Sequence, residues 1–255
     1  MGILYIIATP IGNLKDLTLR ALEVLKEADL VVCEDTRQTI KLLNHYDIKK
    51  PIVSYFQHSK LSKVEYIIGE LAAGKKIALV TDAGTPGISD PGGKLIEQIL
   101  RLLPSDEGRA GWGVEKENTS PSQSPPQLRG RGNGIKIIPI PGPNAAIAAL
   151  SVSGFPTDKF IFMGFPPHKK GRNKFFDEVA QAKYAVVFYE STHRIIKTLK
   201  QLIETQNLTE RQIIVCRELT KVFESIYRGT AEEILKILES DKNNQKGEFV
   251  IAVGK

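Results

Sequence analysis

The chain is poor in the residues that build disulfide frameworks and metal sites, and it lacks long apolar runs. It contains two cysteines and four histidines among 255 residues, too few and too scattered for a disulfide framework or a zinc site. We therefore expect no metal, and we expect Cys33 and Cys216, which lie in apolar runs, to be core residues. The apolar runs, such as residues 3–8, are far shorter than the roughly 20 residues of a membrane span. No secretory signal pattern opens the sequence, so we expect a cytoplasmic protein.

Two common nucleotide-binding signatures are also missing. The loop after the first apolar run contains only Gly12, whereas the dinucleotide fingerprint G-x-G-x-x-G needs three glycines to cradle a pyrophosphate. Asp35 follows the second apolar run and resembles the ribose-binding acid of such enzymes, but without the glycines this match is weak. The Walker A lysine pattern is absent as well. The sequence thus argues against a nicotinamide-dependent oxidoreductase and against a P-loop NTPase.

Positive charge is in excess. Lysine and arginine number 35 against 29 aspartates and glutamates, which gives a net charge of +6 and a pI of about 9.1. Such a balance favours a polyanionic partner, because phosphate groups are attracted to a basic surface. The hydrophobic content of 42% and the charged content of 25% are those of a globular protein.

The apolar runs predict two α/β domains. In residues 1–153, strand-like runs alternate with helical patterns, which is typical of a doubly wound, mostly parallel sheet. In residues 154–255 the strands become aromatic and alternating, and helices separate only some of them, which predicts a mixed sheet. The predicted strands are residues 3–8, 30–33, 51–56, 77–80 and 135–140 in the first domain, and residues 159–163, 184–189, 212–217, 222–228 and 248–253 in the second.

Residues 104–134 interrupt this pattern. The segment is rich in proline, glycine, serine and charged residues, and it has almost no aliphatic side chains, so it cannot offset the entropy of ordering. We interpret it as a disordered insertion that contains the single tryptophan, Trp112. Its removal would join Leu103 to Ile135 and restore an ordinary step from helix to strand.

Three loops rich in proline and glycine follow strands of the first domain. They are Thr9–Asn13, Val80–Gly93 and Pro139–Asn144. The carboxyl ends of parallel strands meet at one edge of a sheet, where open α/β sheets bind their ligands. Because these loops lack a phosphate cradle, we expect them to hold an uncharged adenosine group through backbone amides and carbonyls.

Seven ordered motifs carry a family resemblance. They are TPIGNLKDLTLRA, CEDTRQT, TDAGTPGISDPGG, IPIPGPNA, SGFPTDKFIFMGFPPHKKGR, FYESTHR and RELTK. In this order the chain resembles the ribosomal RNA small subunit methyltransferase I family of the tetrapyrrole methylase superfamily, over both predicted domains but not over residues 104–134. The resemblance implies S-adenosyl-L-methionine bound in a cleft between two α/β domains, and a homodimer. It further implies 2′-O-methylation of a cytidine in the decoding region of 16S rRNA, with the small ribosomal subunit as partner.

The resemblance also implies positions for the cofactor. Three residues depart from the family pattern: Asn144 and Thr81 stand where serine is expected, and Thr192 stands where proline is usual. Asn144 can still donate and accept hydrogen bonds. The predicted cofactor-binding residues are Pro10, Gly12, Asp82, Ala83, Gly84, Thr85, Ile88, Asn144, Ala145, Glu190 and Leu219.

A ribose hydroxyl is a poor nucleophile, so a general base can assist the transfer. We predict that Asp35 or Glu34 acts in this way, because their turn ends a strand at the same sheet edge; Asp82 and Glu190 are alternatives. A basic window at residues 168–174 predicts an RNA-binding surface. The predicted RNA-binding residues are Lys15, Arg37, Lys169, Lys170, Arg172 and Arg194.

Other functions stay open on the sequence alone. A methylase of another RNA site is one alternative. A methylase of a small tetrapyrrole-like molecule would share the cofactor loops but would not need the basic window, and the CEDTR, SDPGG and HKKGR motifs favour RNA. A non-catalytic RNA-binding or assembly protein would not need intact cofactor loops. Binding of S-adenosylmethionine would therefore separate the last class from the others.

Overall fold

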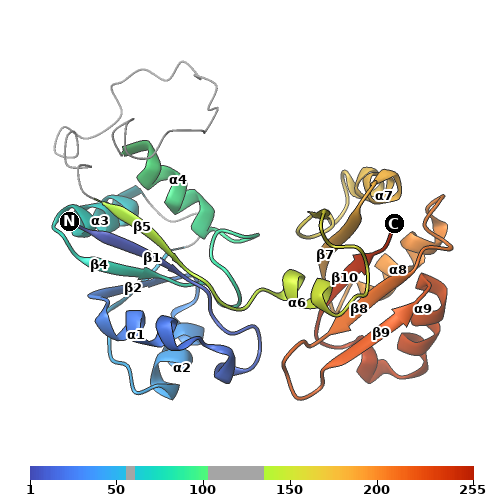
Figure 1. Cartoon of the computed structure of the whole chain (residues 1–255), viewed down its shortest axis with the longest axis horizontal. Coiled ribbons are helices and arrows are strands. Elements are labelled where there is room, and N and C mark those ends of the chain that lie inside the picture. The colour runs from blue at the N-terminus through green and yellow to red at the C-terminus, as the bar shows by residue number, and fades with distance from the viewer. Residues whose placement is uncertain (56–60, 103–134) are drawn as a thin grey trace. The chain divides into compact units, whose positions relative to one another are not determined.

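The computed structural model describes residues 1–55, 61–102 and 135–255. The chain forms two compact units, which the colours of Figure 1 trace from blue to red. The first unit comprises residues 1–10 and 14–143, and the second comprises residues 11–13 and 144–255. The units thus divide at Pro143 and Asn144, whereas the sequence prediction placed the boundary between residues 153 and 154. The predicted insertion at residues 104–134 lies outside the described residues.

The first unit is built on a parallel sheet of five strands in the order β3-β2-β4-β1-β5. Since neighbouring strands run the same way, each connection must cross over the sheet, and helices make these crossings. This arrangement confirms the predicted doubly wound sheet. The elements are β1 (Ile3–Ile7), η1 (Leu14–Asp16), α1 (Leu19–Glu27), β2 (Leu30–Cys33), α2 (Thr36–His45), β3 (Ile52–Ser54), α3 (Leu61–Ala72), β4 (Lys76–Leu79), α4 (Gly92–Leu102) and β5 (Lys136–Ile140).

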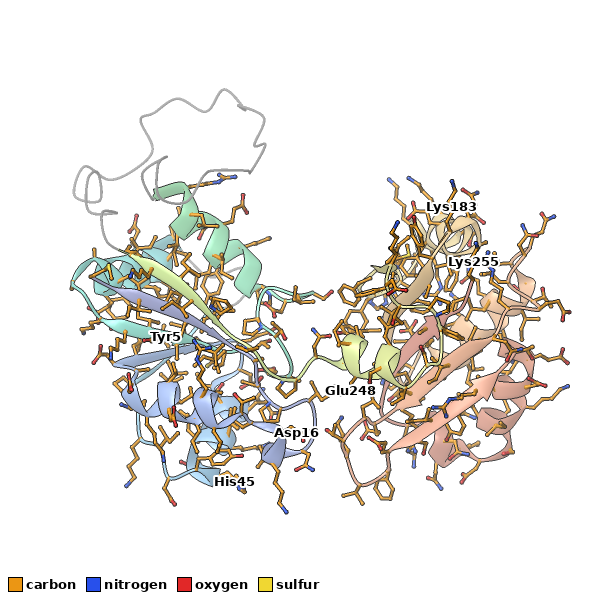
Figure 2. All side chains as sticks on the ribbon, viewed as in Figure 1. Tyr5, Asp16, His45, Lys183, Glu248 and Lys255 are labelled. Carbon is orange, nitrogen blue, oxygen red and sulfur yellow. The ribbon has the colours of Figure 1, made fainter. Side chains whose placement is uncertain are left out.

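Two apolar cores cover the two faces of this sheet. Along β1, Leu4 and Ile6 belong to the core that also contains side chains of α3 and α4. Tyr5 and Ile7 belong to the core with side chains of α1 and α2, and Figure 2 marks Tyr5 on this strand. This alternation explains why the strands are almost continuously apolar, because both of their faces are buried.

The second unit contains a mixed sheet in the order β6-β7-β10-β8-β9. Strands β6 and β7 are parallel, and the other neighbours are antiparallel, as predicted. The elements are α6 (Ala145–Ser151), β6 (Phe160–Phe162), α7 (Arg172–Gln181), β7 (Ala185–Ser191), α8 (Ile195–Glu204), β8 (Ile213–Arg217), β9 (Ser225–Gly229), α9 (Ala231–Ser240), η3 (Lys242–Gln245) and β10 (Glu248–Val253).

Helices α7, α8 and α9 pack on one face of this sheet, and α6 packs on the other. The small side chains of Ala146 and Ala149 let α6 lie close to β7 and β10. Both cysteines are buried, and burial raises the pKa of Cys33 and, to about 12, the pKa of Cys216. These thiols therefore stay protonated at neutral pH, as expected of core residues.

Two kinds of feature are absent from the part of the chain that the structure describes. None of its helices has the length and hydropathy of a membrane span. No cluster of histidine, cysteine and acidic side chains in these residues has the geometry to hold a metal ion.

Candidate active site at the carboxyl edge of the first sheet

The first and second predicted loops are joined directly within the first unit. The amide of Thr9 donates to the carbonyl of Gly84 at 2.8 Å, and the amide of Gly84 donates back to Thr9 at 3.0 Å. The hydroxyl of Thr9, which is 2% exposed, donates to the carbonyl of Thr81 at 3.0 Å. The loops after the parallel strands β1 and β4 are thus joined by an isolated antiparallel bridge.

The third loop meets the other two. The amide of Ala8 donates to the carbonyl of Ile140 at 3.2 Å, and the hydroxyl of Thr85 donates to the carbonyl of Pro143 at 3.2 Å. A Cβ atom at Gly142 would lie 3.0 Å from the Cβ atom of Ala8. Only glycine permits this close approach without displacement. The predicted convergence of the three loops is therefore confirmed.

The long second loop is fixed by its own backbone and by one carboxylate. Gly84 and Gly87 adopt left-handed φ values of 86° and 88°, a conformation that glycine reaches without steric cost. The carboxylate of Asp90 accepts from the amide of Gly87 at 2.9 Å and from the amide of Gly92, at the start of α4, at 2.7 Å. Asp90 thus ties the loop to the start of α4.

Sequence reasoning missed Thr9 and Asp90. An available signal for Asp90 was its position directly before the helical pattern, where aspartate commonly caps a helix. Nothing in the sequence indicated that the Thr9 hydroxyl reaches the Thr81 carbonyl, because the two residues become neighbours only in the folded sheet.

Glu34, Asp82 and Asp90 concentrate negative charge at this edge. The hydroxyl of Thr81 donates to Glu34 at 3.5 Å, and the amide of Asp35 donates to Asp82 at 3.1 Å. Burial, followed by the charges of Asp82 and Asp90, raises the pKa of Glu34. Burial also raises the pKa of Asp82. A carboxylate with a raised pKa is the better proton acceptor.

Asp35 has a different environment from Glu34, although the two are adjacent. Its carboxylate caps α2 by accepting from the amide of Arg37 at 2.8 Å, and it accepts three further hydrogen bonds from the Arg37 guanidinium, at 3.0, 3.1 and 2.6 Å. These hydrogen bonds lower the pKa of Asp35 to about 2. The role of Asp35 as a base therefore stays a prediction that this environment does not favour.

The surface of this edge fits the methyl donor that the sequence predicted. Asp82 and Ala83 are exposed, and Ile88 is 46% exposed, which offers apolar contacts to a flat adenosine group. The clustered carboxylates favour a cation, and a sulfonium is one. Pro10 and Gly84 are buried and Thr85 is half-buried, so these three residues shape the loops more than they cover a ligand.

The remaining predicted cofactor residues belong to the second unit. The side chain of Asn144 caps α6 by accepting from the amides of Ala146 and Ile147, at 3.1 and 3.2 Å, and Ala145 is the first residue of that helix. Gly12 lies against Leu219, because a Cβ atom at Gly12 would be 3.0 Å from the Leu219 carbonyl.

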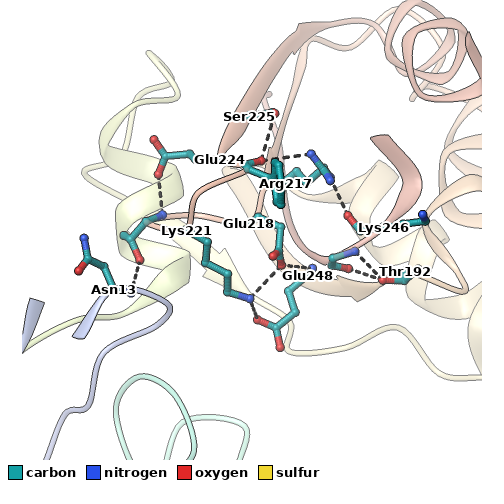
Figure 3. Close-up of polar contacts among 12 residues, drawn as sticks. Asn13, Thr192, Arg217, Glu218, Lys221, Glu224, Ser225, Lys246 and Glu248 are labelled. Carbon is teal, nitrogen blue, oxygen red and sulfur yellow. Dashed lines mark hydrogen bonds and ion pairs between the residues drawn. The ribbon is translucent and has the colours of Figure 1, made fainter. Parts of the chain in front are cut away.

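Figure 3 shows how the segment around Leu219 is held. The amide of Asn13 donates to the Thr220 hydroxyl at 3.1 Å, and the amide of Thr220 donates to Glu224 at 2.6 Å. Lys221 pairs with both Glu218 at 2.9 Å and Glu248 at 2.8 Å. Glu218 and Thr220 adopt left-handed φ values of 51° and 67°. Such strain in non-glycine residues persists only where the surroundings fix the backbone.

Glu190 lies in a buried ionic cluster. It is 1% exposed and accepts from the Thr198 hydroxyl at 2.6 Å, and it forms an ion pair with Arg194 at 2.8 Å. Arg172 approaches it to 3.9 Å and donates to Gln201 at 2.8 Å. These contacts use both carboxylate oxygens of Glu190. The predicted contact between Glu190 and the cofactor therefore stays a prediction, and the buried cluster does not favour it.

The cluster also corrects the predicted RNA-binding surface. Arg172 is 4% exposed, so its guanidinium faces the protein interior and is not available to a phosphate. Arg194 is half-buried and is engaged by Glu190 and by the carbonyl of Pro166 at 2.8 Å. The exposed members of the predicted set are Lys15, Arg37, Lys169 and Lys170.

Comparison with known proteins gives one family. The family model for tetrapyrrole (corrin/porphyrin) methylases matches residues 3–104 and 126–235. A protein of Halalkalibacterium halodurans named ribosomal RNA small subunit methyltransferase I is 42% identical over 253 residues, which cover 99% of this chain and 75% of the relative. A protein of the same name from Thermotoga maritima is 38% identical over 242 residues, which cover 95% of this chain and 94% of the relative.

Solved structures agree on the fold. Diphthine synthase superposes with a TM-score of 0.67 at 14% identity, over 99% of this chain and 90% of that protein. Uroporphyrin-III-C-methyltransferase from Thermus thermophilus superposes with a TM-score of 0.61 at 17% identity, over 100% and 95%. At these identities the likeness concerns the fold alone.

Proposed function

The chain belongs to the tetrapyrrole methylase family, and we propose that it is an S-adenosylmethionine-dependent methyltransferase that methylates the 2′-hydroxyl of a cytidine in 16S rRNA. The observation that carries the proposal is the hydrogen-bonded convergence of three loops at one sheet edge. The rRNA methyltransferases that share about 40% of its residues over nearly the whole chain support the same function.

The residues of this edge divide into those that bind and those that move a proton. S-adenosylmethionine, when bound, supplies an electrophilic methyl group on a positively charged sulfur. Ala83 and Ile88 would contact its adenosine group, and the carboxylates of Glu34 and Asp82 would balance its charge. Contacts from Gly12 and Leu219, and the placement of the cofactor between the two domains, stay predictions.

The protein must also orient the ribose hydroxyl of the RNA. Orientation of two reacting groups can contribute about 7–11 kcal/mol to a barrier, and a base adds typically 10²–10⁴-fold in rate. Glu34 is the better candidate for the base, because burial raises its pKa, whereas pairing with Arg37 lowers the pKa of Asp35 to about 2. Asp82, with a pKa that burial raises, is the second candidate.

The finer features of the proposal rest on the family resemblance and on charge. We place the target cytidine in the decoding region, the substrate in the small ribosomal subunit, and the enzyme in the cytoplasm as a homodimer. The net charge of +6 and the exposed Lys15, Arg37, Lys169 and Lys170 support an RNA substrate, because phosphate contacts dominate affinity for nucleic acids.

A methyl-transfer assay tests this function. The purified chain is incubated with radiolabelled S-adenosylmethionine and small ribosomal subunits from a strain that lacks the gene. We expect label at one cytidine whose 3′ phosphodiester then resists alkaline hydrolysis, because the 2′-oxygen is blocked. Particles reconstituted with 2′-deoxycytidine at that position should accept no label. Label on a base atom would contradict the 2′-O assignment, and small subunits that accept no label would overturn the proposal.

A further inference from the structure

A basic groove lies on the second unit, between the start of α7 and one side of α8. It encloses about 600 Å³ and is lined by residues of the 168–173 segment and of α8. The lining includes the cationic side chains of Lys169, Lys197 and Lys200, together with His168, whereas Glu204 is its only acidic residue. The groove therefore favours an anionic ligand.

The start of α7 adds to this preference. The residue before the helix, Gly171, has a left-handed φ of 84° and provides no side-chain cap. The first amides of a helix have no partner within the helix, and its dipole favours negative charge at this end. Asn173, in the first turn of α7, lines the same groove. Backbone dipole and lysine charges thus act on one space.

Side-chain contacts connect the walls of the groove. Arg172 donates to Gln201 at 2.8 Å, and Gln201 donates to Asn173 at 2.9 Å, which ties α7 to α8. The Arg172 guanidinium also donates to the carbonyl of Pro167 at 3.2 Å, which holds the segment that carries Lys169. Lys200 also forms an ion pair with Glu239 of α9 at 2.9 Å, in which both side chains are about half exposed. The backbone segments that carry the three lysines are therefore connected to one another.

We propose that this groove binds the phosphodiester backbone of the RNA substrate, with Lys169, Lys197 and Lys200 as the phosphate ligands. The inference rests on the proposed rRNA substrate and extends it to α8, which the predicted RNA-binding set did not include. The groove adds affinity without reading sequence, because phosphate contacts position a nucleic acid and base contacts specify it.

The test compares two double variants that carry the same change of charge. Lys197→Glu/Lys200→Glu reverses two groove residues, and Lys236→Glu/Lys242→Glu reverses two exposed residues of α9 and η3 that do not line the groove. The probe is deproteinised 16S rRNA, and its affinity for the full chain is measured across a series of salt concentrations. Thermal unfolding and calorimetric S-adenosylmethionine binding are recorded for each variant.

We expect the groove variant to bind the RNA more weakly and to lower the slope of log affinity against log salt by about 1.4, because each lost contact to a single strand contributes roughly 0.7. The neutral variant Lys197→Gln/Lys200→Gln should lower the slope as well, which separates lost contacts from new repulsion. The control variant should keep the wild-type slope, and all variants should keep wild-type cofactor affinity and unfolding temperature.

Four results would overturn the inference. One is a groove variant that keeps the wild-type slope of log affinity against log salt. Another is an equal loss of slope in both charge-reversed double variants, and a third is a wild-type chain that does not bind deproteinised rRNA even at low salt. A loss confined to intact particles would assign the groove to a ribosomal protein and would also overturn it. None of these results contradicts the proposed function as long as the wild-type protein still methylates small subunits. Failure of the groove proposal is therefore distinguishable from failure of the proposed function.

Discussion

The substitution Glu190→Gln tests whether the buried cluster of the second unit is a structural device. The Glu190 carboxylate is fully buried, and it is the only acidic partner of Arg172 and Arg194 among the ion pairs of the described residues. Glutamine has the same shape but no charge. Its NH₂ group would also face a donor in place of an acceptor oxygen, since the Thr198 hydroxyl donates to one carboxylate oxygen of Glu190 and the amide of Ser191 donates to the other.

The magnitude follows from burial. The side chains of Arg172 and Arg194 are 5% and 15% exposed, so Glu190→Gln leaves two guanidinium groups without a counter-charge. Removal of one partner from a buried ion pair costs about 3–5 kcal/mol. For a chain of this size, such a loss lowers the unfolding temperature by on the order of 10 °C.

A matched control is available on the surface of the same unit. Glu178 pairs with Lys174 at 3.8 Å, and their side chains are 54% and 82% exposed. Glu178→Gln makes the same chemical change, and exposed pairs of this kind contribute about 0.3–0.5 kcal/mol. Thermal unfolding without cofactor, together with hydrogen exchange in α7 and α8, measures both variants. If Glu190→Gln matched the control in stability but lost S-adenosylmethionine affinity, Glu190 would be a cofactor ligand and the structural reasoning would be refuted.

Three further predictions concern the first unit. Thr9→Val removes the hydroxyl that joins two loops, so we expect a loss of about 1–3 kcal/mol in stability and weaker cofactor binding by calorimetry. Thr9→Ser should restore both. An unchanged cofactor affinity in Thr9→Val would show that this hydroxyl contact does not shape the site. Glu34→Gln should slow single-turnover methylation, and it should also stabilise the protein near neutral pH. Because the pKa of Glu34 is raised in the folded state, its contribution to stability is greatest below its unfolded pKa of 4.5. This contribution is lost as pH rises through the folded pKa. An equal stability difference between wild type and Glu34→Gln at pH 4 and pH 7 would contradict the raised pKa. Asp35→Asn should leave the single-turnover rate within about twofold of wild type, since a group with a pKa near 2 is a weak base. The stability that Asp35 adds is present above its unfolded pKa of 3.8 and is lost as pH falls toward 2. The free energy of unfolding of Asp35→Asn should therefore depend less on pH in this acid range than that of the wild type. A large loss of methylation rate in Asp35→Asn would restore Asp35 as the base.

Most of the fold could be predicted because the strands are short apolar runs bounded by glycine and proline. Sequence patterns of this kind reflect burial on both faces of a sheet, and the β1 residues show that burial directly. The three loops could be predicted for the same reason, because parallel strands must end at one edge. The boundary of the second unit was harder to place, because the packing of the alanine-rich α6 on β7 and β10 depends on strands that lie far along the chain.

The polar residues of the site could not be ranked from the sequence. Glu34 and Asp35 are adjacent and chemically similar, yet one is partly desolvated beside Asp82 and the other is paired with Arg37. A basic window in the sequence also does not show which of its charges point inward. Arg172 is buried because Glu190 and Thr198, residues of another strand and helix, surround its guanidinium in the fold.

The most direct test of the account is a map of ribose methylation on small-subunit rRNA from cells with and without the gene. We predict that the deletion removes one 2′-O-methyl group from a cytidine of the decoding region, and that the wild-type gene restores it while Glu34→Gln restores it poorly. An identical methylation map in the two strains would contradict the proposed function.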